Sequence, residues 1–343
     1  MNNNITKFPY KVSPLDPKQN AQLRQHFKGE SSHFVQVGPE RYLFPSKYES
    51  DAEKIYNFPV RPDDVWVVTF PRSGTTWTQE LVWLIANGLN YEEARTTPLT
   101  ERFPFLEFNV FVDNVRLAEF RAENSGNLEH QEIIDSIATP QYEQLRECTG
   151  RRFIKTHIPL SLLPPDLMTS GAKIIYVARN PKDVAVSYFN LYKLFRTLDF
   201  TGDFDTFWNY FQNDLVGWAP YWNHVKEGWS HRDNPNVLFL FYEDMNKDLP
   251  SCIHRVSEFL STPLTQDQIE QLAAYLDIKN FRANPSVNFD QLIRVGVCRA
   301  QSDGFIRQGK SGGWKSKFSS ELNMQADKWI EENLRNTDIR FPE

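Results

Sequence analysis

Four mostly apolar runs recur along the chain, and each is followed by a polar or glycine-containing segment. They span residues 65–70, 152–155, 173–178 and 237–242. Short runs rich in β-branched and aromatic residues indicate buried strands. Strands of this kind that are separated by helices are typical of a parallel sheet covered on both faces. The pattern therefore predicts a single α/β domain with a central parallel sheet and helices on both of its faces.

Helical periodicity fills the segments between these strands. Trp77, Leu81, Leu84 and Ile85 share one face of a helix predicted over residues 75–87, which Asn87-Gly88 would end. Further helices are predicted from about residue 184 and over residues 205–227, 249–260, 266–275 and 320–334. Residues 1–60 are polar and punctuated by proline, and we expect them to pack as a lead-in on a domain of residues 61–343.

Composition narrows the classes of function. The 343 residues carry 38 Lys and Arg against 44 Asp and Glu, and the net charge of −6 disfavours a dedicated nucleic-acid binder. The three cysteines lie far apart and no two histidines are three or four residues apart, so neither a disulfide framework nor a structural zinc is expected. The longest apolar runs have about six residues, against about 20 needed to cross a bilayer, and the N-terminus lacks a signal-peptide pattern. We expect a cytoplasmic protein without membrane insertion.

Residues 71–77, Pro-Arg-Ser-Gly-Thr-Thr-Trp, connect the first strand to its helix. Gly74 lets the backbone approach a ligand closely, and the free N–H groups that follow it would point from the helix N-terminus at an anion. The segment is of the type that cradles phosphate, although it is not the G-x-x-x-x-G-K-[ST] sequence. A strand-to-helix turn capped by threonine is the alternative. The donors of the predicted cradle are Arg72, Ser73, Gly74, Thr75, Thr76 and Trp77.

Cations and hydroxyls also follow the other predicted strands, at the carboxyl edge where α/β sheets bind ligands. Lys155 and His157 follow the second strand, where a histidine is either a general base or a buried structural residue. Arg179 follows the third strand and Ser187 lies in the next helix; the planar arginine fork suits a phosphate, unless it is simply solvated. Residues 307–315 form a basic loop with three glycines. Together these segments predict an anion site at one sheet edge.

These segments resemble motifs of the cytosolic sulfotransferase family. Residues 69–77 are similar to its 5′-phosphosulfate loop, and the Phe-Pro-Arg-Ser version of that loop is similar to the one in insect members. Residues 155–159, Lys-Thr-His-Ile-Pro, resemble the motif that carries the catalytic histidine. Residues 179–187, 241–245 and 307–315 resemble three further nucleotide-binding motifs, in family order.

The resemblance implies in-line transfer of a sulfuryl group from 3′-phosphoadenosine 5′-phosphosulfate (PAPS) to the hydroxyl of a small apolar or aromatic acceptor such as a phenol, steroid or retinoid. The product nucleotide would be 3′-phosphoadenosine 5′-phosphate (PAP), with no metal. His157 would be the general base, and Arg72, Lys155 and Ser187 would complete the catalytic set. The nucleotide would be held by Arg72, Ser73, Gly74, Thr75, Thr76, Trp77, Arg179, Ser187, Tyr242, Arg307, Gln308 and Gly309.

The acceptor side rests on the same resemblance. Residues 102–108 are similar to a stretch that lines the family's acceptor pocket, and Phe105, Phe108, Leu191 and Phe289 would form its walls. With 26 phenylalanines in the chain, a place in the core is the alternative for each of them. An aromatic pocket suits a flat, apolar alcohol or phenol.

The chain departs from the family pattern at several positions. Arg72 stands where the family has a lysine, and because arginine keeps its proton its role there would be electrostatic. Gln308 removes one positive charge from the 3′-phosphate loop, and residues 276–281 lack the usual Thr-Ser-Phe. The family's dimer motif is not intact in residues 315–324, so a homodimer stays open.

Three other functions also stay open. They are a dehydratase acting through a sulfated allylic alcohol, an ATP-dependent small-molecule kinase and a silent nucleotide or lipophile carrier. The predicted strand that ends at Ala178 is followed by Arg179 rather than by an aspartate that could hold magnesium, which disfavours the kinase.

Overall fold

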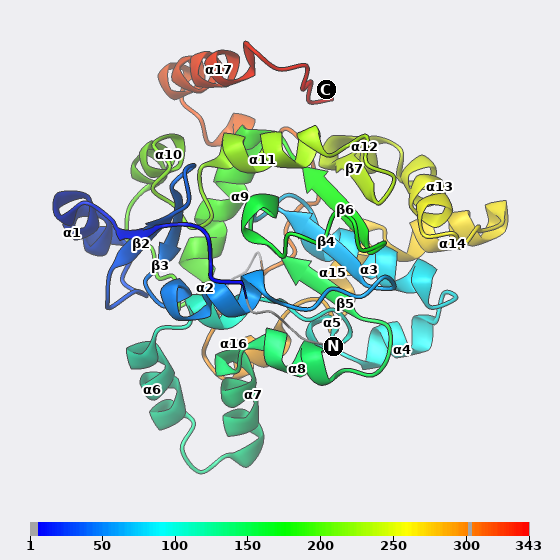
Figure 1. Cartoon of the computed structure of the whole chain (residues 1–343), viewed down its shortest axis with the longest axis horizontal. Coiled ribbons are helices and arrows are strands. Elements are labelled where there is room, and N and C mark those ends of the chain that lie inside the picture. Colours follow the sequence, from blue (N-terminus) through cyan, green and yellow to red (C-terminus); the bar gives the residue numbers. More distant parts are fainter. Residues whose placement is uncertain (1–5, 301–303, 343) are drawn as a thin grey trace.

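Four parallel strands form the centre of the protein, in the order β5-β4-β6-β7 (Figure 1). The computed structural model describes residues 6–300 and 304–342; the first five residues, on which the expectation about a signal peptide partly rests, lie outside this part. The strands are β4 (Val65–Thr69), β5 (Phe153–Thr156), β6 (Lys173–Ala178) and β7 (Val237–Phe241). The four predicted strands are confirmed, within one or two residues at their ends.

Side chains from successive strand positions enter two different cores. Val65 and Val67 of β4 join a cluster with α3, α13 and α14, whereas Trp66 and Val68 join a cluster with α2, α9, α10 and α11. Period-2 alternation with apolar residues on both sides is what a sheet covered on both faces requires. The structure thus confirms the predicted α/β domain with helices on both faces.

The helices that contribute to these two cores include α2 (Tyr48–Tyr56), α3 (Thr75–Ala86), α9 (Pro181–Leu194), α10 (Phe204–Gln212), α11 (Tyr221–Ser230), α12 (Tyr242–Lys247), α13 (Leu249–Phe259), α14 (Gln266–Tyr275) and α17 (Ser320–Leu334). The other helices are α1 (Pro17–His26), α4 (Tyr91–Thr96), α5 (Leu99–Arg102), α6 (Asn114–Glu123), α7 (Leu128–Ala138), α8 (Gln141–Glu147), α15 (Ile278–Ala283) and α16 (Asp290–Arg294). Three 3-10 turns are η1 (Phe108–Phe111), η2 (Leu160–Leu162) and η3 (Gly313–Ser316).

One predicted helix is wrong. Residues 205–227 form two helices, α10 and α11, joined by a turn that contains a cis peptide bond before Pro220. Proline lacks an N–H and clashes with the preceding turn, so a helix cannot run through this position unbroken. The break brings Trp218 into the interior, where it is 4% exposed.

The N-terminal segment carries a small antiparallel sheet of its own, β1 (Val12–Pro14), β2 (Phe34–Val37) and β3 (Tyr42–Pro45). Its apolar residues belong to the same core as α9 and α11. The backbone of Leu43 in β3 exchanges hydrogen bonds with Trp218 and Ala219, at 2.9 and 2.8 Å. The N-terminal segment therefore helps to hold the α10–α11 turn in place.

A buried ion pair ties the N-terminal ends of two central strands together. The guanidinium of Arg152 donates to both carboxylate oxygens of Asp64, at 2.7 and 2.5 Å, and neither side chain is exposed. Asp64 also accepts from the backbone N–H of Arg61 at 2.8 Å. Bidentate pairing of this kind fixes geometry as well as charge.

Candidate active site

The turn between β4 and α3 has the geometry of an anion cradle. Gly74 adopts φ +94°, and a Cβ placed on it would lie 2.5 Å from Cδ2 of Tyr242, so only glycine fits this close approach. The N–H groups that follow start α3 and have no partner within the helix. The Ser73 hydroxyl is fully buried and has no hydrogen-bond partner in the described residues. The turn therefore presents unpaired donors at a helix N-terminus, where an anion is stabilised.

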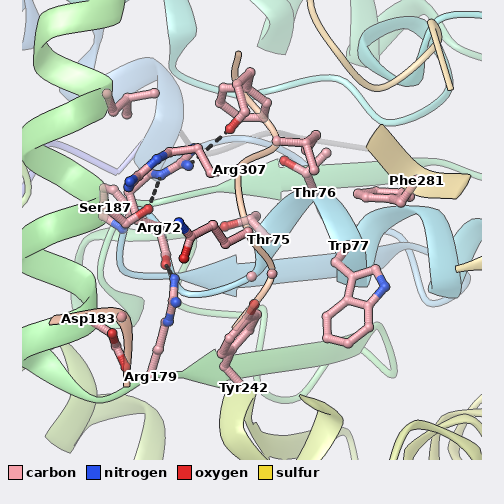
Figure 2. A pocket seen from close by; sticks show the side chains of 18 of the residues that line it. Arg72, Thr75, Thr76, Trp77, Arg179, Asp183, Ser187, Tyr242, Phe281 and Arg307 are labelled. Atoms are coloured by element: carbon pink, nitrogen blue, oxygen red, sulfur yellow. Dashed lines mark hydrogen bonds between the residues drawn. The ribbon is translucent and has the colours of Figure 1, made fainter. Parts of the chain in front are cut away.

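Three arginines converge beside this turn, from segments far apart in the sequence (Figure 2). Arg72 donates through Nε to the Ser187 hydroxyl at 2.9 Å and through Nη2 to the carbonyl of Phe305 at 3.2 Å. Burial, together with the charges of Arg179 and Arg307, lowers the pKa of Arg72 to about 9. Cations crowded in this way are stabilised by a bound polyanion.

The aromatic rings of Tyr242 and Trp77 lie beside the arginine cluster. The guanidinium of Arg179 lies 4.1 Å from the ring centre of Tyr242, and its Nε is buried without a partner in the described residues. Trp77 lies 5.8 Å from Tyr242 and donates through Nε1 to the carbonyl of Leu276 at 3.0 Å. Flat surfaces beside a cation cluster suit a nucleotide with several phosphates.

The glycine-rich C-terminal loop is anchored over the cradle. Asp183 of α9 accepts hydrogen bonds from the backbone N–H groups of Gly312 and Trp314, at 2.7 and 3.0 Å. Arg179 donates to the carbonyl of Lys310 at 3.1 Å. Gly309, at φ +61°, packs so tightly on Ile278 that a Cβ would lie 2.5 Å from its Cδ1. The loop is thus held at both the cation cluster and the residue 276–281 segment.

His157 lies at the end of β5, with its ring oriented by β4. Its Nδ1 is 2.8 Å from the carbonyl oxygen of Thr69, so Nδ1 carries the proton that it donates there. Nε2 then holds the free lone pair, with no hydrogen-bond partner in the described part of the chain. Burial and the charge of Lys155 lower the pKa of His157 well below 6.5. The imidazole is therefore neutral at neutral pH, as a general base must be.

Lys155 lies in β5, two residues before His157, and is 8% exposed. Burial lowers its pKa to about 8, against the opposing effect of Glu107. Its ammonium lies 4.0 Å from the ring centre of Phe105. Lys155 is thus a desolvated cation between the base and the aromatic wall.

Sequence reasoning did not identify the residues that hold His157. Glu107, fully buried, accepts hydrogen bonds from the His157 N–H at 2.7 Å, the Trp218 indole at 3.1 Å and the Thr156 hydroxyl at 2.8 Å. His224 of α11 contacts the His157 carbonyl oxygen through Nε2 at 2.9 Å. A glutamate inside an aromatic run was the available signal for Glu107, whereas nothing in the sequence pointed to His224.

A cavity of about 540 Å³ joins the cradle and its three arginines to Lys155 and His157. Its second half, which we call the acceptor arm, is walled mainly by aromatic and aliphatic side chains. Trp218 stacks on Phe111 at 3.7 Å, and both Trp218 and Phe105 lie about 5 Å from the His157 ring. The arm is lined by Phe105, Phe108, Phe111, Lys155, His157, Leu191, Phe195, Thr197, Leu198, Trp218, Phe289, Phe305 and Ile306.

The cavity brings together nearly all the residues singled out from the sequence. Ser73 is the exception, since it is buried behind the cradle and does not line the cavity. The others line one continuous space: Arg72, Gly74, Thr75, Thr76, Trp77, Phe105, Phe108, Lys155, His157, Arg179, Ser187, Leu191, Tyr242, Phe289, Arg307, Gln308 and Gly309.

Within residues 6–300 and 304–342, no group of three or more His, Cys, Asp or Glu side chains is placed to hold a metal ion. In the same residues no helix has the length and apolar character needed to cross a bilayer.

Comparisons with known proteins agree with this geometry. The sulfotransferase domain model matches residues 62–338. The luciferin sulfotransferase of Photinus pyralis is 35% identical over 88% of this chain and 80% of its own length, and human sulfotransferase 4A1 is 33% identical over 84% and 86%. Solved structures of retinol dehydratase, one with retinol and PAP and one with androsterone and PAP, are 39% identical over 98% of this chain and superpose with a TM-score of 0.92. The chain therefore belongs to the sulfotransferase family.

Proposed function

We propose that this protein transfers a sulfuryl group from PAPS to the hydroxyl of a small apolar or aromatic acceptor, such as a phenol, steroid or retinoid, with no metal. The observation that carries the proposal is the junction in the cavity. There a cradle of cations and unpaired donors meets an aromatic arm, and the free Nε2 of His157 lies between them. The family match and the PAP bound in the retinol dehydratase structures support the donor.

The donor half fits PAPS residue by residue. The backbone of Gly74, Thr75 and Thr76 would hold the 5′-phosphate, and Trp77 would stack on the adenine. The 3′-phosphate would lie among the cations and donors of the second motif and the C-terminal loop. These are Arg179, Ser187, Arg307, Gln308 and Gly309, with Tyr242 beside Arg179. Ser73 is buried at this turn and does not line the cavity, so it would contribute to the cradle through the backbone of the turn.

In the acceptor half, His157 accepts the proton of the acceptor hydroxyl on Nε2, while Thr69 keeps Nδ1 protonated. PAPS, when bound, supplies the activated sulfuryl group and leaves as PAP. Lys155 stabilises the negative charge on the group in transit, and Ser187 orients Arg72 through its 2.9 Å hydrogen bond. General-base catalysis of this kind contributes about 10²–10⁴-fold.

Arg72 takes the place of the family's lysine, and its geometry indicates an electrostatic role. Its side chain donates to Ser187 and lies 4.7 Å from the ring centre of Phe305, which fixes a cation beside the cradle. With PAPS bound, this cation would stabilise the charge that develops on the leaving phosphate. A fixed cation stabilises the transition state more than the ground state. Arg72 would not act as a proton donor, because arginine keeps its proton.

The walls of the acceptor arm define the acceptor class. Phe105 and Phe108 lie 5.6 Å apart, and Leu191 and Phe289 close the arm further along. Rings arranged in this way bury a flat, apolar molecule and expel water from the reacting hydroxyl.

Thermal unfolding with PAP, beside ATP with magnesium, tests the donor without any assumption about the acceptor. A ligand at about 100 times its dissociation constant adds about 2.7 kcal/mol of stability. We expect stabilisation by PAP in the presence of a chelator. Stabilisation only by ATP with magnesium would refute the donor and favour the kinase. No shift with either would favour a carrier in which His157 and Lys155 are dispensable.

A dehydratase is the second candidate, favoured by the similarity to retinol dehydratase over 98% of the chain. In that case a sulfated allylic alcohol would lose a proton and sulfate inside the arm, so that the C–O bond breaks and a new double bond forms. Mass analysis of the product from retinol and PAPS separates the two. A stable sulfate ester indicates a transferase, whereas free sulfate with a dehydrated product indicates the dehydratase.

We infer that residues 61–343 form the catalytic unit with residues 1–60 packed on it, and that the protein acts in the cytoplasm. The family model over residues 62–338 supports the first inference. For a homodimer, the altered motif in residues 315–324 disfavours the usual interface. Size-exclusion chromatography with light scattering measures the oligomeric state directly.

A further inference from the structure

The acceptor arm contains one hydroxyl that the proposed reaction does not use. Thr197 lines the cavity and is 5% exposed. Its Oγ1 makes no hydrogen bond to any described residue. A hydroxyl that lines a ligand cavity and has no protein partner is available to bond the ligand or water.

The backbone around Thr197 is fixed on both sides. The N–H of Phe195 donates to Leu191 at 3.0 Å, the N–H of Arg196 donates to Val297 at 2.9 Å, and the N–H of Leu198 donates to Phe195 at 3.1 Å. The guanidinium of Arg196 also pairs with the carboxylate of Glu123 at 2.6 Å. Thr197 therefore occupies a defined place in the wall.

A series of ring contacts separates Thr197 from the cradle. Arg72 at the cradle donates to the carbonyl of Phe305, and the ring centre of Phe305 lies 4.3 Å from that of Phe289. Phe289 in turn lies 6.1 Å from Phe195, two residues before Thr197. A molecule that extends from the cradle end of the arm to Thr197 must be elongated.

The surroundings of Thr197 are apolar. Leu191, Phe195 and Leu198 lie near it in sequence, and Phe289 and Phe305 line the same arm. When an acceptor fills the arm it displaces water, and the Thr197 hydroxyl then has a partner only if the acceptor provides one. A site built around a hydrogen bond rejects the analogue that lacks the matching group.

We infer that Thr197 selects elongated acceptors that carry a second oxygen, as a ketone or a hydroxyl, at the end opposite the reacting hydroxyl. A threonine hydroxyl both donates and accepts, so it suits either group. This inference deepens the proposed function and rests on it.

The test compares two acceptors that differ by one oxygen, a 3-hydroxysteroid with a 17-keto group and the same steroid without it. The measurement is the ratio of their kcat/KM values with PAPS. We expect the wild type to favour the keto steroid about tenfold, the effect of one hydrogen bond left unmade. Thr197→Val, which keeps the shape but not the hydroxyl, should bring the ratio to about one, and Thr197→Ser should restore it. Thr197→Ala serves if the valine variant does not fold.

A ratio near one in the wild type, or an unchanged ratio in Thr197→Val, would overturn the inference. If neither steroid is turned over, calorimetry on the PAP-loaded protein gives the same ratio as dissociation constants, and a failure of both steroids to bind also overturns it. Failure of the proposed function gives a different result, namely no stabilisation by PAP and no sulfated product from any acceptor.

Discussion

Replacing Gly74 with alanine tests whether the cradle depends on the close approach of the backbone to Tyr242. The added Cβ would lie 2.5 Å from Cδ2 of Tyr242, so the ring must move by about 1 Å to restore van der Waals contact. That ring is held between Arg179 and Trp77, at 4.1 and 5.8 Å, and cannot move without disturbing both. The substitution therefore disturbs the nucleotide-binding half of the cavity directly.

The magnitude has two parts. A left-handed backbone costs an L-residue about 1–2 kcal/mol, and overpacking adds about 1–3 kcal/mol. Gly88→Ala is the matched control, since Gly88 has φ +64° but a Cβ there meets nothing within 4 Å. We expect Gly88→Ala to lower the free energy of unfolding only by the backbone cost of about 1–2 kcal/mol and to keep the wild-type affinity for PAP.

Calorimetry with PAP and chemical unfolding measure the two effects. We expect Gly74→Ala to bind PAP at least about tenfold more weakly, because misplacement by about 1 Å at a positioned site costs up to 10²-fold. Affinity for PAP within twofold of the wild type, in a variant destabilised no more than Gly88→Ala, would refute the reasoning.

Three further predictions follow from buried charges. Asp64→Asn breaks the buried pair with Arg152 and should cost about 3–5 kcal/mol in the free energy of unfolding measured with urea; a cost below about 1 kcal/mol would contradict this. The value of kcat/KM for PAPS should stay constant down to pH 6.5, because His157 is already neutral there, and should fall as the pH rises through about 8, where Lys155 loses its proton. Lys155→Arg should move that fall to higher pH, and an unmoved pH profile would contradict the role of Lys155. Glu107→Ala leaves three buried donors unpaired and should lower both kcat and the free energy of unfolding, the latter by about 3 kcal/mol. Glu107→Gln keeps one acceptor oxygen and should lower both quantities less; equal decreases in the two variants would contradict the hydrogen-bond account.

Local patterns predicted the strands and the anion cradle well. The run that ends at Thr69 is apolar on both faces, which predicts a buried strand. Gly74, together with the hydroxyl residues after it, predicts a turn into a helix. Because parallel strands end at one edge, the sequence also predicted that His157 and Arg179 would lie near this turn, and they do.

Features that depend on tertiary contacts could not be predicted. Residues 205–227 have helical periodicity, and Pro220 within them is the signal for the break that the prediction missed. The packing of β3 against Trp218, which holds the turn in place, could not be read from the sequence. Glu107 and His224 act through the backbone of His157, at separations of 50 and 67 residues. Only Glu107 has a local signal, as a glutamate inside an aromatic run, and that signal does not reveal its contact with His157. Nothing in the sequence singles out Thr197 either, because its importance depends on its place in the cavity and on its lack of a hydrogen-bond partner among the described residues.

The most direct test of the central claim is a single-turnover measurement of sulfated product from PAPS and an alcohol acceptor, with a chelator present, for the wild type and His157→Ala. The account predicts that the variant binds PAP about as tightly as the wild type and forms product about 10²–10⁴-fold more slowly. A variant that turns over at the wild-type rate, or a correctly folded variant that no longer binds PAP, would contradict the role of His157 as the base.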